Sequence, residues 1–378
     1  MPDRYDDAVV GAGIIGLAHA YHLARRSRRV AVFERSPRAC GASVRNFGML
    51  WPIGQPPGPR VQTALRSRAV WLEVLAAAGL WHDQVGSLHL AYRPDEAAVL
   101  EEFAALARGH GGYEVALVSP AEVRRRCPAV VPDGLVAGLW SATEVCVDPR
   151  AVIAGLPGFL AERYGVTFHF GTAVSGYDAP TVTAGGRSFT AERLWVCSGA
   201  DLETLYPEAL GAAGLVPCKL QMMRTPPVGW RLGPMLAAGL TLKHYAAFAG
   251  CPSLVSLRER FAREYPEHER YGIHVMASQN GAGELVLGDS HEYGPAVTPF
   301  DNPAIDRLIL DYLQTFLHVP DLTIAARWHG VYVKHPAEPW VVLEPAAGVT
   351  ATVGVGGAGM TLSFGLAERV VGTKLGRA

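Results

Sequence analysis

Apolar and polar positions near the start of the chain alternate between two kinds of pattern. A short apolar run over 6–10 enters a glycine-rich turn, and the apolar spacing over 14–26 predicts a helix. A second continuous apolar run, over 29–33, is typical of a strand that is buried on both faces of a parallel sheet. Together these segments predict one strand–helix–strand unit of parallel α/β structure.

The same α/β pattern returns twice farther along the chain. The strand patterns over 194–196 and 351–355 each run into a glycine turn, and a second helical pattern follows the latter turn. Residues 41–60 have no regular period and many Gly and Pro, which predicts a long loop, and long ordered loops are often functional. The other predicted elements are helices over 64–78, 95–108 and 148–163 and strands over 87–91, 166–170, 273–277 and 284–287.

This recurrence predicts two domains that are interleaved along the chain, as the length of 378 residues allows. The fold class is α/β plus α+β: a Rossmann-like dinucleotide-binding domain with an inserted mixed-sheet substrate domain. The first domain is expected over 1–80, 146–216 and 326–378, and the second over 81–145 and 217–325.

Composition and charge exclude several classes of protein. The formal net charge is −1 without a basic block, which argues against nucleic acid as the main partner. No apolar stretch reaches the ~20 residues that span a bilayer, and the start of the chain is acidic, unlike a signal peptide. The six cysteines form no CxxC pair and no metal-ligand spacing. We therefore predict a soluble, cytoplasmic protein without a metal.

A complete dinucleotide fingerprint lies in the first strand–helix–strand unit. Gly11, Gly13 and Gly16 form G-x-G-x-x-G between the strand and the helix. These glycines permit a tight turn, close approach of a pyrophosphate and close helix–strand packing. Glu34 ends the second strand, where an acidic residue accepts hydrogen bonds from ribose hydroxyls and disfavours NADP. The alternative is a glycine turn with a purely structural role.

A second glycine-rich turn, over 354–361, distinguishes FAD from NAD. It feeds a C-terminal helix that a simple NAD dehydrogenase does not need. A helix N-terminus that points at the pyrimidine edge of a flavin stabilises negative charge on the reduced ring. The alternative is an ordinary helix cap.

With these motifs the chain resembles the superfamily of D-amino acid oxidase, glycine oxidase and sarcosine oxidase over nearly its whole length. The resemblance implies an FAD-dependent enzyme that oxidises a C–N bond of a small amine. Residues 300–378 contain no cysteine, which implies noncovalent FAD because sarcosine oxidases attach their flavin in that region. The expected cofactor contacts are Gly11, Gly13, Ile14, Ile15, Gly16, Glu34, Arg35, Ser43, Arg45, Asn46, Gly48, Met49, Val174, Ser198, Gly199, Gly357, Ala358, Gly359, Met360 and Thr361.

Two positions depart from the pattern of the amino-acid-oxidising relatives. Tyr332 and Gly357 stand where those relatives resembling glycine oxidase carry arginines. Bidentate arginine is the usual carboxylate clamp, so this departure argues against an α-amino acid substrate. The strings SVRNFGMLWPIGQ, CKLQMMRT, GDSHEYG and RWHGVYV also resemble a bacterial subfamily associated with aminophosphonate breakdown.

That narrower resemblance implies a primary or N-methylated aminophosphonate as substrate. Hydride transfer to flavin N5 would give an imine, which hydrolyses to an aldehyde; oxygen or another acceptor would reoxidise the flavin. No catalytic acid or base is assigned, although His274 and Tyr332 are candidates. One alternative is a glycine, sarcosine or D-amino acid oxidase or dehydrogenase, with the carboxylate held by Arg45 or Lys334. The other is a non-catalytic FAD-binding protein.

The candidate substrate residues each have an alternative role. Arg45 suits the substrate anion or the FAD pyrophosphate, or is simply a solvated loop residue. Core packing explains Trp51 equally well, and the histidines suit buried, hydrogen-bonded positions. Tyr332 and Lys334 share strand parity and should face one side. The predicted substrate residues are Arg45, Trp51, His274, His291, Tyr332 and Lys334, with Lys243 and His244 as further cationic or donor residues.

Overall fold

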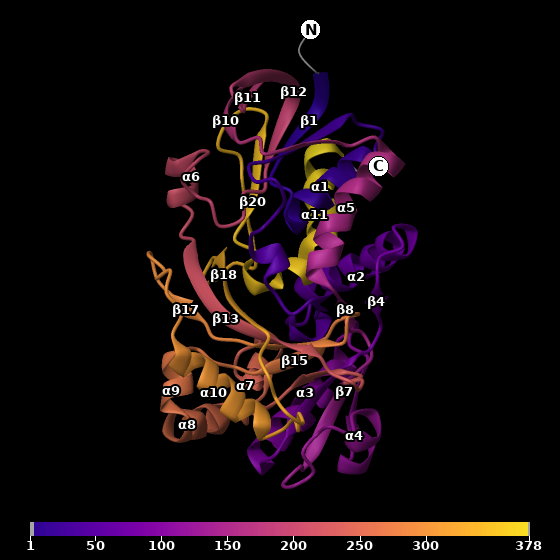
Figure 1. The fold of residues 1–378 in the computed structure, drawn as a ribbon, viewed down its shortest axis with the longest axis vertical. Coiled ribbons are helices and arrows are strands. Elements are labelled where there is room, and N and C mark those ends of the chain that lie inside the picture. The colour runs from indigo at the N-terminus through magenta and orange to yellow at the C-terminus, as the bar shows by residue number, and fades with distance from the viewer. Residues whose placement is uncertain (1–3, 377–378) are drawn as a thin grey trace.

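The computed structural model describes residues 4–376, which form two large sheets at opposite ends of an elongated molecule (Figure 1). The N-terminal strand and the C-terminal helix both lie at the end that contains the first sheet. Segments from the beginning, middle and end of the chain therefore build this sheet together.

The first sheet is parallel at its centre. Strand β1 lies between β2 and β12, with β9 beyond β2 and β20 beyond β12. The carboxyl ends of these strands meet at one edge, where open α/β sheets bind their ligands. The strands are β1 (Arg4–Val10), β2 (Val30–Glu34), β9 (Thr167–Phe170), β10 (Val174–Asp178), β11 (Thr181–Ala184), β12 (Arg187–Val196), β19 (Val341–Leu343) and β20 (Val349–Val353).

Helices cover one face of the first sheet. Successive strand residues point to opposite faces, so Val9 packs in the cluster that contains the helices while Ala8 packs in a separate cluster on the other face. The short helix α6 contributes Leu210 to that second cluster. The helices are α1 (Ile14–Ala24), α2 (Pro59–Ala77), α5 (Pro149–Tyr164), α6 (Pro207–Gly211) and α11 (Gly359–Leu375).

The second sheet is mixed and lies at the other end of the molecule (Figure 1). Its order is β17-β13-β16-β15-β14-β5-β7-β6, and β18 pairs with the long strand β13. The strands are β5 (Ser87–Ala91), β6 (Val115–Val118), β7 (Ala137–Ser141), β13 (Val216–Pro227), β14 (Met235–Ala237), β15 (Met276–Gln279), β16 (Glu284–Gly288), β17 (Glu292–Tyr293) and β18 (Ala326–Lys334). The helices of this region are α3 (Pro94–Gly109), α4 (Pro120–Arg126), α7 (Gly239–Leu242), α8 (Leu254–Glu264), α9 (Pro266–Arg270) and α10 (Pro303–Gln314).

A small third sheet ties the long loop to the rest of the chain. It consists of β3 (Met49–Leu50), β8 (Val145–Val147) and β4 (His82–Asp83), with β8 in the middle. The loop itself contains two short 3-10 turns, Ala42–Val44 and Pro52–Gly54. The sequence pattern predicted the loop as irregular and missed these turns.

The predicted fold class is confirmed, but one domain boundary and several element limits differ, among them the starts of α2 and β15. The last segment of the nucleotide-binding domain was expected to start at 326. Strand β18 (Ala326–Lys334) pairs with β13 in the second sheet, so that segment starts only after β18. Helix α2 begins at Pro59 rather than 64, because proline suits the first turn of a helix. Strand β15 begins only at Met276, although the pattern predicted a strand from 273. Within 4–376, no helix combines the length and apolar content that crossing a bilayer takes.

Candidate active site

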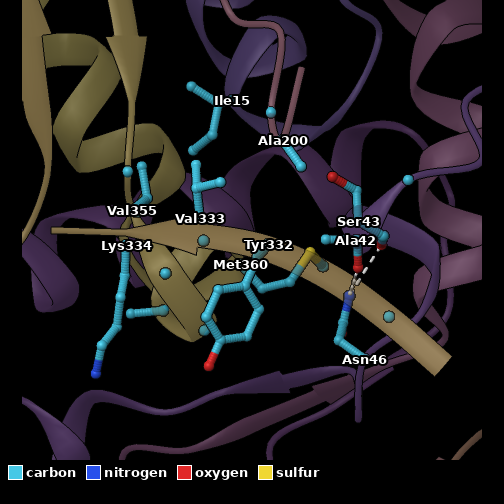
Figure 2. A pocket seen from close by; sticks show the side chains of 18 of the residues that line it. Ile15, Ala42, Ser43, Asn46, Ala200, Tyr332, Val333, Lys334, Val355 and Met360 are labelled. Atoms are coloured by element: carbon cyan, nitrogen blue, oxygen red, sulfur yellow. Dashed lines mark hydrogen bonds between the residues drawn. The ribbon is translucent and has the colours of Figure 1, made fainter. Parts of the chain in front are cut away.

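A cavity of about 840 Å³ opens where the carboxyl edge of the first sheet meets the second sheet. The glycine turn and the start of α1 line one part of it, and β18 and loops of the second sheet line another. Figure 2 shows part of this lining, with Ile15 from α1, Met360 from α11 and Tyr332 from β18 around the same space.

The fingerprint glycines have the conformations that the motif demands. Gly11 has φ +98°, and a side chain there would place its Cβ 2.5 Å from the Cys197 carbonyl oxygen. A Cβ on Gly16 would lie 1.9 Å from the Gly11 carbonyl oxygen, which explains the close helix–strand packing. Gly13 meets only the Ser43 hydroxyl at 3.1 Å, and no side chain caps the helix that begins after it. The start of α1 therefore presents a narrow approach for an anionic group.

Glu34 stands at the carboxyl end of β2, beside the glycine turn. Its Oε2 accepts a hydrogen bond from the Ala12 amide at 3.0 Å, and its Oε1 accepts one from the Ser36 amide at 3.0 Å. These bonds fix the carboxylate at the cavity wall. The position is the one that ribose recognition requires.

Side-chain hydrogen bonds hold the loop after β2 in place (Figure 2). Asn46 Nδ2 donates to the Ala42 and Ser43 carbonyl oxygens, each at 3.0 Å, and Asn46 Oδ1 accepts from the Gly48 amide at 2.8 Å. The Ser43 hydroxyl in turn accepts from the Ile14 amide at 3.0 Å. The loop is thus fastened to the first turn of α1.

The C-terminal glycine turn also lines the cavity. Helix α11 begins at Gly359 without a side-chain cap, and a Cβ on Gly359 would meet nothing within 4 Å. Thr361 Oγ1 accepts from the Trp51 amide at 2.9 Å, which ties this helix start to the long loop. The N-termini of α1 and α11 therefore both open on one cavity.

Most predicted cofactor residues line this cavity, and three do not. Gly16 serves the close packing described above, and a Cβ on Gly48 would lie 2.0 Å from the Val147 carbonyl oxygen. Val174 packs in the hydrophobic cluster on the far face of the first sheet. The predicted residues that line the cavity are Gly11, Gly13, Ile14, Ile15, Glu34, Arg35, Ser43, Arg45, Asn46, Met49, Ser198, Gly199, Gly357, Ala358, Gly359, Met360 and Thr361.

Tyr332 and Lys334 lie on one side of β18, and Val333 lies on the other (Figure 2). The tyrosine ring lies 3.7 Å from the position of a Cβ on Gly357, so the two positions that depart from the arginine pattern are neighbours in space. Burial raises the pKa of the Tyr332 hydroxyl well above its usual value, which keeps it a neutral donor.

Lys334 is the cation at the cavity end of β18, whose other cation, Arg327, pairs with Asp306. Its Nζ lies 4.5 Å from the centre of the Tyr293 ring, a cation–π contact. It lines the cavity, and no carboxylate in residues 4–376 pairs with it. The ammonium group is therefore available to an anion inside the cavity.

Three histidines from separate segments meet at the wall that the second sheet contributes. The ring centres of His244 and His274 lie 3.8 Å apart, those of His244 and His291 4.5 Å, and those of His274 and His291 5.0 Å. Burial lowers the pKa of His274 and of His291, the latter to about 4, whereas the His244 ring is exposed toward the cavity. Asp289 joins them, and burial raises the pKa of its carboxyl group.

Arg45 and Trp51 line the cavity with different surroundings. Arg45 is half-buried, and its Nη1 donates to the His329 carbonyl oxygen at 3.2 Å. Trp51 is 3% exposed, and its ring lies 6.1 Å from that of Tyr245. Its Nε1 is buried without a hydrogen-bond partner in the described structure.

Lys243 differs from the other expected residues because it does not line the cavity. Its ammonium group pairs with Glu269, and burial lowers the pKa of this lysine to about 8. Because Glu269 already pairs with its charge, Lys243 has a structural role beside the second sheet and is not a partner for a substrate anion.

Sequence reasoning missed several residues of the cavity wall. Arg60 lines it from the first turn of α2, and its buried Nε has no partner among the described residues. Tyr245 and Asp289 line it as well, and so does Tyr293, which the string GDSHEYG had already indicated beside His291. Arg60 ends the Gly/Pro-rich loop that was expected to be functional, and Asp289 lies in GDSHEYG, so the sequence held a signal for both; Tyr245 lies in a segment without a motif.

The chain belongs to the FAD dependent oxidoreductase (DAO) family, whose model matches residues 6–372. It is 29% identical over 214 residues to glycine oxidase from Geobacillus kaustophilus, a match that covers 53% of this chain and 56% of that protein. It is 26% identical over 206 residues to monomeric sarcosine oxidase from Streptomyces avermitilis, which covers 53% of each chain. These matches span about half the length of the curated relatives.

Solved structures share the whole fold. Glycine oxidase from Geobacillus kaustophilus superposes with a TM-score of 0.78 at 21% identity, covering 100% of this chain and 96% of that one. L-proline dehydrogenase from P. horikoshii gives a TM-score of 0.76 at 19% identity, covering 100% and 95%. These structures show the shared fold, and the family match over residues 6–372 confirms the predicted superfamily.

Proposed function

We propose that this protein is an enzyme that binds FAD and uses it to oxidise a C–N bond of a small amine. The observation that carries the proposal is one cavity with two unlike walls. One wall has two uncapped helix starts and the Glu34 carboxylate, and the other has tyrosines, histidines and an unpaired lysine. A dinucleotide and a small polar substrate would fit these walls respectively.

The residues present suit FAD. The start of α1 would hold the pyrophosphate, where a side chain at Gly13 would obstruct it, and Glu34 would bind the ribose. The start of α11 would face the flavin ring. Gly199 and Gly359 leave this space open, because a Cβ on either would meet nothing within 4 Å. FAD, when bound, supplies the electron acceptor for the amine.

The cofactor is proposed to be noncovalent. Two cysteines line the cavity, Cys40 and Cys197. Burial raises the pKa of the Cys197 thiol, which disfavours the reactive thiolate. Acid precipitation should therefore release intact FAD into the supernatant and leave a colourless pellet. Yellow colour in the pellet would contradict noncovalent binding and point to the exposed Cys40.

The protein's own residues would bind and orient the amine. His274, His291 and Tyr332 are buried and held neutral, so these side chains do not favour an ammonium ion through a fixed negative charge. A dry, neutral wall lowers the pKa of a bound amine and favours the form that can be oxidised. His274 and Tyr332 stay candidates for contact with the reacting atoms, without an assigned acid or base role.

We further propose an aminophosphonate as the substrate. Lys334 supports this because a buried anion needs a cationic partner, and Tyr332 adds a hydroxyl donor on the same side of β18. A phosphonate accepts from such separate donors, whereas an α-carboxylate is usually gripped by a planar arginine fork. Arg45, His291 and Trp51 complete the proposed substrate contacts. Oxygen or another acceptor would reoxidise the flavin.

The second candidate is an α-amino acid or N-methylated amino acid. The matches to proteins named glycine oxidase and monomeric sarcosine oxidase favour it, and Arg45 or Arg60 would then meet the carboxylate. Anaerobic reduction of the bound flavin by 2-aminoethylphosphonate, its N-methyl form, glycine and sarcosine separates the two. We expect the phosphonates to reduce it faster; faster reduction by glycine or sarcosine would favour the amino-acid function.

A further inference from the structure

Four side chains from three segments of the chain converge at one point of the cavity wall. His244 follows α7, His274 precedes β15, and Asp289 and His291 follow β16. One ring nitrogen of each histidine lies within 4.8 Å of one ring nitrogen of both others. His274 and His291 are buried, and His244 faces the cavity.

The Asp289 carboxylate lies between two of these histidines. Its Oδ1 is 3.3 Å from His274 Nε2, and its Oδ2 is 3.9 Å from His291 Nε2. Two ligands of one tetrahedral zinc ion are about 3.4 Å apart, given bonds of about 2.0–2.1 Å. The separation of Asp289 and His274 matches this value, whereas the separation of Asp289 and His291 and those between the histidine nitrogens, up to 4.8 Å, are wider, so side-chain rotation would close the ligand set around an ion.

Hydrogen bonding prepares one histidine and leaves other atoms without partners. The Gly272 carbonyl oxygen lies 3.1 Å from His291 Nδ1 and can accept its proton, which leaves the Nε2 lone pair free. Such a carbonyl contact is the usual way that proteins orient a metal-binding histidine. His274 Nδ1 and Asp289 Oδ1 are both buried and have no hydrogen-bond partner within the described residues. A native protein rarely leaves such atoms unsatisfied.

A cation explains this arrangement better than an anion does. A phosphonate or carboxylate at this point would give the Asp289 carboxyl group no counter-charge and the imidazole lone pairs no acceptor. A divalent ion would instead give that carboxylate a counter-charge and give the imidazoles a ligand. Three histidines and one carboxylate suit zinc and related borderline ions.

We propose that His244, His274, His291 and Asp289 form a binding site for a divalent transition-metal ion of the zinc class. No pattern in the sequence indicates this site, because its ligands come from three segments without a metal-ligand spacing. The site lies on the wall away from the glycine turn and goes beyond the proposed amine oxidation. Metal binding is measured without substrate, so either proposal can fail alone.

The test uses untagged protein with its bound flavin, after chelator treatment and dialysis. Zinc uptake is measured by calorimetry and by elemental analysis per chain, and cobalt(II) serves as an optical probe beyond the flavin absorption. We expect one tightly bound ion and the absorption of four-coordinate cobalt. Uptake without a defined stoichiometry, or six-coordinate cobalt only, would overturn the proposal.

Variants then locate the ion. His274→Ala and Asp289→Asn should each weaken zinc binding at least about tenfold, since even indirect partners of metal ligands matter that much. His329→Ala is the matched control, because this histidine bonds Asp301 outside the cluster. Flavin content and thermal unfolding check folding. If either variant fails to fold, His291→Gln takes its place; zinc affinity unchanged in the folded variants would overturn the site.

Lys334 gives a check of opposite sign. Lys334 lines the same cavity as the three histidines, so its positive charge opposes a metal ion placed among them. Lys334→Met should therefore strengthen zinc binding severalfold, whereas adventitious binding at surface histidines would not respond. Weaker zinc binding in this variant would contradict the proposed position.

Discussion

The two walls of the cavity are built on different principles. The nucleotide wall is made mainly of backbone: glycine turns, helix starts and one carboxylate at the end of a strand. The substrate wall is made of side chains from β18 and from loops of the second sheet. Backbone recognition requires glycine at fixed spacing, so it leaves a sequence motif. Side-chain recognition depends on which segments the fold brings together, and it leaves almost none.

This difference predicts that damage to the nucleotide wall removes the cofactor, whereas damage to the substrate wall leaves it. Gly13→Val should have the largest effect and reduce bound FAD to near zero, because the added side chain fills the approach to the start of α1. Flavin absorbance per purified chain measures this loss.

Gly158→Val is the matched control for that variant. Gly158 is an exposed glycine of α5 with open space around its Cβ position, away from the cavity. Its variant should keep full flavin content. Stoichiometric FAD in a folded Gly13→Val protein would mean that the cofactor site is misplaced.

Lys334→Met should have the next largest effect, and only on the substrate side. The loss of a buried ion contact typically costs on the order of 2–5 kcal/mol, or roughly 30-fold or more in affinity. The apparent dissociation constant for an aminophosphonate, from anaerobic flavin reduction, should rise by that factor while flavin content stays normal.

Lys374→Met removes a surface lysine that pairs with Glu344, and it should change substrate binding little. Arg45→Ala tests the other ranked cation, with flavin content measured because Arg45 is also an expected cofactor residue. If Lys334→Met and Arg45→Ala both bind the substrate with normal affinity, neither residue is the partner of the anion. Arg60 then becomes the candidate partner.

Glu34→Gln should weaken FAD binding by about tenfold or more. Hydrogen bonds to charged groups contribute about 1.5–3 kcal/mol, and the amide keeps the shape of the side chain. Titration of the apoprotein with FAD, followed by fluorescence quenching, measures the change. An unaltered dissociation constant would show that Glu34 serves only the Ala12 and Ser36 amides.

Tyr332→Phe should have the smallest effect. Loss of one neutral hydrogen bond costs about 0.5–1.5 kcal/mol, or roughly a 2- to 12-fold decrease in kcat/KM for the aminophosphonate. The ring packing against the Gly357 turn stays the same, so flavin content and thermal stability should not change. An unchanged kcat/KM would leave Tyr332 a packing residue only.

The same contrast explains how much the sequence could predict. Gly11, Gly13 and Glu34 were identified correctly as neighbours because a strand–helix–strand unit has one geometry and the spacing encodes it. Val174 was misplaced with respect to this cavity, since its expected role came from resemblance and its side chain packs on the far face of the sheet.

The substrate wall was predictable only where strand parity applied. Alternation on β18 correctly placed Tyr332 and Lys334 on one side. The meeting of His244 with His274 and Asp289 depends instead on how α7, β15 and β16 come together in the second sheet, which no local pattern encodes. Such long-range convergence is why the cluster was missed as a unit.

The central claim is that this cavity holds FAD against the C–N bond of an amine, and flavin bleaching under nitrogen tests it most directly. The matched pair of compounds is 2-aminoethylphosphonate, or its N-methyl form, and 2-hydroxyethylphosphonate, which keeps the anion but replaces the amine by a hydroxyl group. We predict that an amine reduces the flavin in a single turnover and that the alcohol leaves it oxidised. Bleaching by the alcohol as fast as by the amines, or no bleaching by any aminophosphonate or amino acid, would contradict the account.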